Sequence, residues 1–207
     1  MIRLPHAVRN DERLLSQLFF MPLVQRNSIV PPLRLAFLMW VFFAVQFFLN
    51  IDLGFLGVLP RSAWGLVGIF TAPLVHGSWN HIISNTFPLI FLGTTLFVFY
   101  NSVAVRVFVQ CYLLTGLCVW IFGRNFYHIG ASGLVYGLAF FLISFGFFRK
   151  DFKSLSIAIV VVVLYGGIIY GIFPSQPRVS WESHLFGALI GVGSAFTMRK
   201  DRSLDYD

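Results

Sequence analysis

The chain has 207 residues, of which 57% are hydrophobic and 11% are charged, and its net charge is +7. A soluble domain usually has about a quarter of its residues charged, so this composition excludes an ordinary soluble protein and predicts an integral membrane protein. The basic residues lie singly or in pairs beside apolar segments. This arrangement argues against a nucleic-acid partner and makes the lipid bilayer the expected one.

The first part of the chain, residues 1–32, is expected to be a cytoplasmic segment, because charges interrupt it and leave no apolar core typical of a signal peptide. Six apolar segments follow, each suited to one bilayer crossing of about 20 residues. The predicted crossings are 33–50, 81–100, 103–122, 131–148, 155–172 and 183–198. Residues 51–80 mix Pro, Gly and charged residues with aromatic ones, which predicts an irregular, half-immersed first loop.

These segments predict an all-α polytopic bundle with one membrane domain over residues 33–198 and a cytoplasmic tail over 199–207. The basic residues predict its orientation, because Lys and Arg are retained on the cytoplasmic side. With the N-terminus inside, the only basic residues outside are Arg61, Arg124 and Arg178. Both termini are therefore expected in the cytoplasm, and the membrane is expected to be a bacterial plasma membrane.

Polar residues are costly inside a bilayer, so those within the apolar segments become candidates for a functional site. His81 and Asn85 lie at the start of the second segment, Ser132 starts the fourth, and His184 starts the sixth. In the predicted orientation these three segments all begin at the outer face. Their polar side chains are therefore expected at one level in the membrane.

The fourth and sixth segments are expected to pack closely, because both have glycines four residues apart. These glycines are Gly133 and Gly137 in the fourth segment and Gly187 and Gly191 in the sixth. Such packing would bring the Ser132 hydroxyl within hydrogen-bond reach of the His184 imidazole. Tyr136 lies one turn after Ser132, where its ring could pack beside that imidazole.

Structural roles are the competing interpretation of the same residues. A membrane serine often bonds to the preceding helical turn, and glycine pairs are common packing devices. His128 is an alternative base, but its expected place is an interfacial loop. His76 and His81 lack the spacing and the glutamate of a zinc motif, so neither a metal nor another cofactor is predicted.

Three motifs in sequence resemble those of the rhomboid family of intramembrane serine proteases, over about residues 33–198. They are HGSWNHIISN at 76–85, GASGLVYG at 130–137 and HLFGALIG at 184–191. The resemblance implies a nucleophile at Ser132 and a general base at His184. It also implies an oxyanion site formed by Asn85, His81 and the backbone N–H of Ser132.

Supporting roles are implied for Tyr136, which would hold the imidazole, and for four glycines, Gly130, Gly133, Gly187 and Gly191. No acidic residue is evident near the pair, so a dyad is expected rather than a triad. Two positions depart from the family pattern. Val67-Gly68 replaces a frequent Trp-Arg pair in the first loop, and Phe97 replaces a frequent glutamate.

The implied activity is proteolysis of single-span membrane proteins near the outer face, so the expected partners are transmembrane substrates. The alternative is a non-catalytic binder or escort of transmembrane clients. A small-solute transporter is disfavoured, because the chain has no internal repeat and its apolar segments contain no Asp, Glu or Lys. The sequence pattern assigns no oligomeric state.

Overall fold

The computed structural model describes residues 29–174 and 179–201. Most of the expected N-terminal segment, the end of the tail and Arg178 lie outside the described residues. The described residues form seven α-helices, with three short 3-10 helices, η1 to η3, between them. The α-helices are α2 (Val30–Leu49), α3 (Gly65–Thr71), α4 (Trp79–Phe99), α5 (Asn101–Phe122), α6 (Ser132–Arg149), α7 (Phe152–Tyr165) and α8 (Trp181–Met198).

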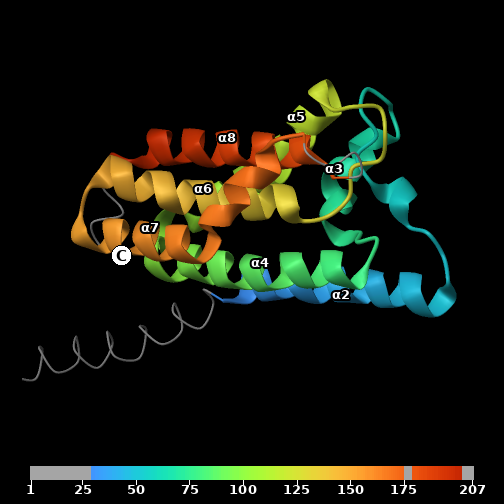
Figure 1. Ribbon diagram of the computed structural model, residues 1–207, viewed down its shortest axis with the longest axis horizontal. Helices are drawn as coiled ribbons and strands as arrows, with labels where there is room; N and C mark the ends of the chain where they lie inside the picture. The colour runs from blue at the N-terminus through green and yellow to red at the C-terminus, as the bar shows by residue number, and fades with distance from the viewer. Residues whose placement is uncertain (1–28, 175–178, 202–207) are drawn as a thin grey trace, which may run out of the picture.

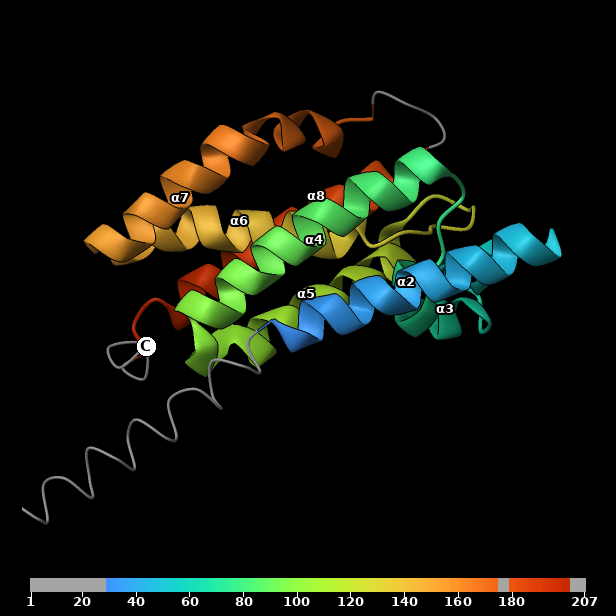
Figure 2. The ribbon, with the colours of Figure 1, turned by 90° about the horizontal axis from the view of Figure 1, so that it is seen from below.

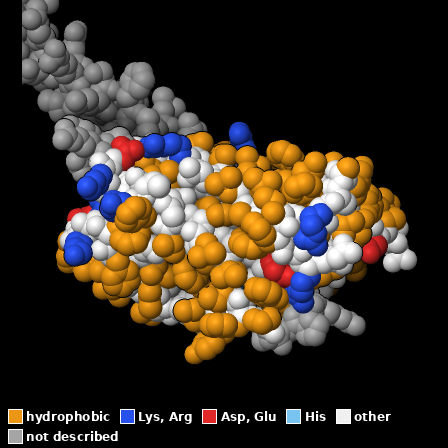
Figure 3. Space-filling model, turned by 90° about the horizontal axis from the view of Figure 1, so that it is seen from above, with side chains coloured by type: hydrophobic (Ala, Val, Ile, Leu, Met, Phe, Trp, Pro, Cys, Tyr) orange, Lys and Arg blue, Asp and Glu red, His pale blue; other side chains and the backbone are white. Residues whose placement is uncertain are grey.

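The six long helices coincide with the six predicted crossings, and all but α7 match them within a few residues. Five stretches are long and apolar enough to cross a membrane: α2, α4, α5, α6, and α7 together with its 3-10 extension to Ile172. The sixth helix, α8, has 18 residues but begins with Trp181, Glu182, Ser183 and His184, which make it more polar. On the face drawn in Figure 3, hydrophobic side chains cover the middle and most charged side chains lie toward the two ends. This distribution is typical of an integral membrane protein.

Helix α6 occupies the centre of the bundle and packs against α4, α5, α7 and α8 (Figure 1). Its closest neighbour is α8, as the glycine spacing predicted. A Cβ atom at Gly187 would lie 2.1 Å from the Gly133 carbonyl oxygen, and one at Gly191 would lie 2.2 Å from the Gly137 carbonyl oxygen. Any larger residue at either position of α8 would therefore push the two helices apart.

The first loop is ordered and packs at the end of the bundle where α6 begins (Figure 1). It contains η1 (Gly54–Leu56), α3 and η2 (Ala72–Leu74). The Arg61 guanidinium donates to the carbonyl oxygens of Ile121 and Gly123 at the end of α5, at 3.1 and 2.9 Å. These bonds fix the loop to α5 although it lacks the Trp-Arg pair, since carbonyl groups at a helix C-terminus have no partner within the helix.

The fifth predicted crossing matches an apolar stretch over Phe152–Ile172, but its last part is not α-helical. An α-helix was expected to continue to residue 172, but α7 ends at Tyr165 and the chain continues as the 3-10 helix η3 over Gly166–Ile172. Gly166 and Gly167 follow directly, and glycine is among the residues least favourable to an α-helix. In Figure 2, η3 continues from the end of α7 toward the end of the bundle where α6 starts.

Candidate active site

The turn before α6 places Ser132 at the first position of that helix. Gly130 in this turn has a φ of +100°, which favours glycine. A Cβ atom there would also lie 2.5 Å from Nε2 of His81. Because Ser132 is the first helical residue, its N–H has no carbonyl partner within α6 and lies at the positive end of the helix dipole.

The side chains of Ser132 and His184 form a hydrogen bond, as the sequence predicted. The distance from Ser132 Oγ to His184 Nε2 is 2.9 Å. The ring of Tyr136 stacks on the imidazole with centroids 4.1 Å apart and an angle of 4° between the planes. His184 is 9% exposed and Tyr136 is 6% exposed, so the two stacked rings have little access to solvent.

The other imidazole nitrogen of His184 faces a backbone carbonyl. Its Nδ1 lies 2.9 Å from the oxygen of Gly171 in η3. Glu182 is close in sequence, but both of its oxygens bind Arg124, at 2.5 Å from Nε and 3.0 Å from a terminal nitrogen. The group that contacts Nδ1 is thus a carbonyl group, which no sequence motif indicated.

His81 and Asn85 lie in the same cavity as the pair. This cavity has a volume of about 940 Å³, and Ser132, Tyr136 and His184 also line it. Ser78 caps α4 by accepting a hydrogen bond from the His81 backbone N–H at 3.2 Å, so the helix starts just before His81. The Asn85 amide donates to the His81 carbonyl at 2.8 Å. This bond uses one of the two amide N–H groups, so the second can donate to another acceptor.

The turn that precedes Ser132 is contacted by His76, a residue for which the sequence had suggested no role. His76 is 1% exposed, and its Nε2 accepts a weak hydrogen bond of 3.4 Å from the Ala131 N–H. Burial, together with the neighbouring His81 ring, lowers the pKa of His76 to about 3, although the Leu74 carbonyl opposes the shift. His76 is therefore neutral at pH 7 and supports the turn.

His128, the alternative base, lies in the loop before α6, as expected, and its side chain is buried. One ring nitrogen lies 2.6 Å from Ser180 Oγ and the other 3.0 Å from the Arg124 carbonyl oxygen. With both nitrogens engaged, His128 connects the loop before α6 to the start of α8 and has no contact with Ser132. Burial lowers the pKa of His128, which keeps this link neutral.

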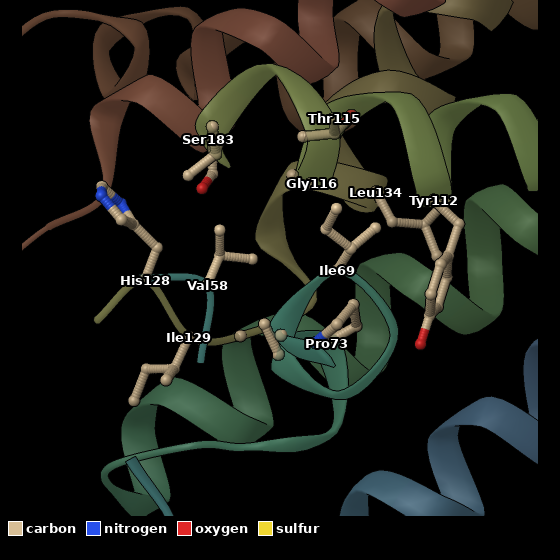
Figure 4. Close-up of a pocket in the computed structure, with 15 residues that line it drawn as sticks. Val58, Ile69, Pro73, Tyr112, Thr115, Gly116, His128, Ile129, Leu134 and Ser183 are labelled. Atoms are coloured by element: carbon tan, nitrogen blue, oxygen red, sulfur yellow. The ribbon is translucent and has the colours of Figure 1, made fainter. Parts of the chain in front are cut away.

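A second cavity, of about 30 Å³, lies between the first loop, α5 and the start of α6 (Figure 4). Its walls come from the first loop, α5, the segment before α6 and the first turns of α6 and α8, and they include Val58, Ile69 and Leu134. Within the described residues no group of three or more His, Cys, Asp or Glu side chains could hold a metal ion.

Comparison with known proteins gives the same family as the sequence motifs. The rhomboid domain matches residues 60–201. An uncharacterized protein of Mycobacterium tuberculosis is 37% identical over 161 residues, which is 72% of this chain and 67% of the relative. One from Mycobacterium leprae is 36% identical over 152 residues, 67% of this chain and 60% of the relative.

A plant relative is also similar to the chain. The chloroplast rhomboid-like protein 11 of Arabidopsis thaliana is 30% identical over 155 residues, covering 66% of this chain and 54% of the relative. The domain match covers well over half of the chain and includes the turn of Ser132 and all of α8. The chain therefore belongs to the rhomboid family of membrane proteins.

Proposed function

We propose that the protein is an intramembrane serine endopeptidase that cleaves the transmembrane segments of single-span membrane proteins. The observation that carries this proposal is the 2.9 Å hydrogen bond between Ser132 Oγ and His184 Nε2. It lies in a large cavity at one end of a membrane bundle, where an unused serine and histidine would be costly. A nucleophile in contact with its base is the arrangement that covalent catalysis needs.

In the proposed reaction, Ser132 Oγ attacks the carbonyl carbon of the scissile peptide bond and its proton passes to His184 Nε2. The tetrahedral intermediate collapses, the C–N bond breaks, and His184 returns the proton to the leaving amine. Water then attacks the acyl ester, giving its proton to His184, and Ser132 regains a proton as the carboxylic acid leaves.

The negative oxygen of the intermediate needs donors that are already in place. Three are proposed: the backbone N–H of Ser132, the free N–H of the Asn85 amide, and the His81 side chain. The first is at a helix N-terminus and the other two line the cavity. Losing one oxyanion donor typically lowers turnover by about 10²- to 10³-fold.

The proposed substrate is a transmembrane helix that can unwind near its end. A helix hides its peptide carbonyls in its own hydrogen bonds, so none is available to Ser132 until the helix opens. Glycine and proline disfavour a helix by about 1 and 3 kcal/mol relative to alanine. Substrates with such residues near the outer end are therefore expected to be cleaved fastest.

The proposed orientation places the cavity at the outer face of a bacterial plasma membrane, with both termini inside. Arg61 and Arg124 lie at the cavity end of the bundle, in the first loop and after α5. The opposite end has more basic residues, namely Arg34, Arg106, Arg149, Lys150, Lys153, Arg199 and Lys200. Basic residues are retained on the cytoplasmic side, so this end is assigned to the cytoplasm.

The test is to label the purified protein with a fluorophosphonate and to assay a model single-span substrate with and without a Gly-Pro pair near its outer end. Wild type should be labelled and should cleave the helix-broken substrate faster. Ser132→Ala should abolish both signals, and His184→Ala should reduce them to background. If wild type binds the substrate but neither cleaves it nor is labelled, the protein is a binder or escort instead.

A further inference from the structure

We propose that the backbone carbonyl of Gly171 is a positioning group that takes the place of the acid of a catalytic triad. It would hold the His184 ring with its proton on Nδ1. This inference rests on the proposed function, since it concerns how the same base is prepared.

The argument begins with the chemistry of the two groups. A carbonyl oxygen can only accept a hydrogen bond, so the 2.9 Å contact with Gly171 requires a proton on Nδ1 of His184. A neutral imidazole has only one N–H, and Nε2 is then left with its lone pair. That lone pair faces Ser132 Oγ at 2.9 Å and can accept the serine proton. The opposite tautomer would set two lone pairs against each other at Gly171 and would leave Ser132 without a base.

The same contact would help after proton transfer. When Nε2 takes the serine proton, the ring becomes an imidazolium, and its Nδ1–H is then a charged donor to the carbonyl. Hydrogen bonds from charged donors are roughly twice as strong as neutral ones. A carbonyl dipole gives this support without the large cost of burying a carboxylate ion.

Two contacts together fix the orientation of the His184 imidazole ring. Stacking on Tyr136 sets the plane of the imidazole, because the two rings are within 4° of parallel. The Gly171 hydrogen bond lies at the edge of the ring and sets its rotation within that plane. Neither contact alone would determine which nitrogen faces Ser132.

The position also explains why residue 171 is a glycine. A Cβ atom there would lie 1.8 Å from the Tyr136 hydroxyl oxygen and 3.1 Å from His184 Nδ1. A side chain at this position must therefore move the carbonyl, the tyrosine or the imidazole. Gly167, in the same 3-10 helix, has no atom within 4 Å of such a Cβ and provides a matched control.

The first experiment observes the proton directly, with ¹⁵N NMR of imidazole-labelled full-length protein in detergent and His184→Ala to assign the signal. The expected spectrum has His184 protonated at Nδ1 and unprotonated at Nε2 near neutral pH. A spectrum with the proton on Nε2 would overturn the proposal. This readout needs no enzymatic activity, so it stands even if the protein proves not to be a hydrolase.

The second experiment measures fluorophosphonate labelling in Gly171→Ala and Gly167→Ala. Gly171→Ala should reduce the maximal labelling rate by about 10-fold or more, the scale of general-base effects, with the half-saturating concentration little changed. It should also lose the Nδ1–H signal, whereas Gly167→Ala should match wild type in both. A Gly171→Ala protein that labels at the wild-type rate would refute the role.

These outcomes separate the two proposals. If wild type is not labelled at Ser132, the proposed hydrolase function fails, and the tautomer still reports on the Gly171 contact. If wild type is labelled but its imidazole carries the proton on Nε2, the function stands and the positioning role fails. If Gly171→Ala does not fold, the wild-type spectrum alone decides the inference.

Discussion

At the scale of single residues, three histidines near the start of α6 have different roles because they have different hydrogen-bond partners. His184 faces Ser132 and a carbonyl, His128 connects two segments, and the buried His76 contacts the turn before Ser132. Only His184 has a nitrogen directed at the serine. Residue type therefore indicates where a functional site is possible, and hydrogen-bond partners distinguish the proposed base from the structural histidines.

The neutral state of His76 predicts a loss of stability in acid. Its pKa is about 3 in the folded protein and about 6.5 when exposed, so the unfolded chain binds a proton more readily. The contribution of neutral His76 to the free energy of unfolding is complete above pH 6.5. It is lost as the pH falls from 6.5 toward 3, by up to about 1.4 kcal/mol for each pH unit.

The measurement is the thermal unfolding midpoint in detergent between pH 7.5 and 4.5, in wild type and in His76→Gln. The glutamine variant should be less stable at neutral pH but should lose less stability on acidification. A wild-type midpoint that does not change over this range would contradict the buried neutral state. His128 also has a lowered pKa, so the variant should keep part of the dependence.

At the scale of helices, the contact between α6 and α8 determines whether the site exists. Ser132 and His184 come from different helices, and their distance depends on backbone contact at Gly187 and Gly191. The bundle therefore needs small residues on the face of α8 that contacts α6. Gly193 lies elsewhere on the same helix, and a Cβ atom there would have no atom within 4 Å. Gly187 and Gly193 therefore allow a controlled comparison.

Gly187→Leu should separate the helices and lower activity by about 100-fold or more, because a displacement of about 1 Å can cost 10²-fold in rate. Gly193→Leu should keep nearly wild-type activity, since that position faces open space. Fluorophosphonate labelling and substrate cleavage measure the effect, and far-UV circular dichroism checks helix content. Equal activity in the two variants would mean that the close contact is not needed.

At the scale of the whole molecule, the cavity and the basic residues lie at defined ends of the bundle, and this predicts accessibility in cells. A cysteine at the exposed Ala63, in the first loop, should react with an impermeant thiol reagent added to intact cells. A cysteine at the exposed Lys150, after α6, should react only after the cells are opened.

The control for this experiment is the parent chain, whose free cysteines are Cys111, which is buried, and Cys118, which is partly buried. Any background reaction therefore comes from Cys118 and can be subtracted. The reverse pattern, with Lys150→Cys accessible and Ala63→Cys protected, would place the cavity on the cytoplasmic side. In that case the proposed cleavage near the outer face would be wrong.

The sequence by itself determined the membrane class, the six long segments and the residues of the candidate pair. It could do so because polar groups are costly in apolar segments and glycines four residues apart indicate close helix contacts, so these residues carry information. The stacking of Tyr136 on His184 and the close contact at Gly187 followed from helical spacing alone, and the structure contains both contacts.

Only the tertiary structure decided which groups contact the His184 imidazole and the turn of Ser132. The Gly171 carbonyl has no side chain to mark it, and it reaches His184 because the chain leaves the α-helical path at Gly166. His76 and His128 lie in loops, and their burial depends on how the first loop and the start of α8 pack. Contacts made by backbone atoms or between distant loops leave no periodic pattern, so the sequence could not predict them.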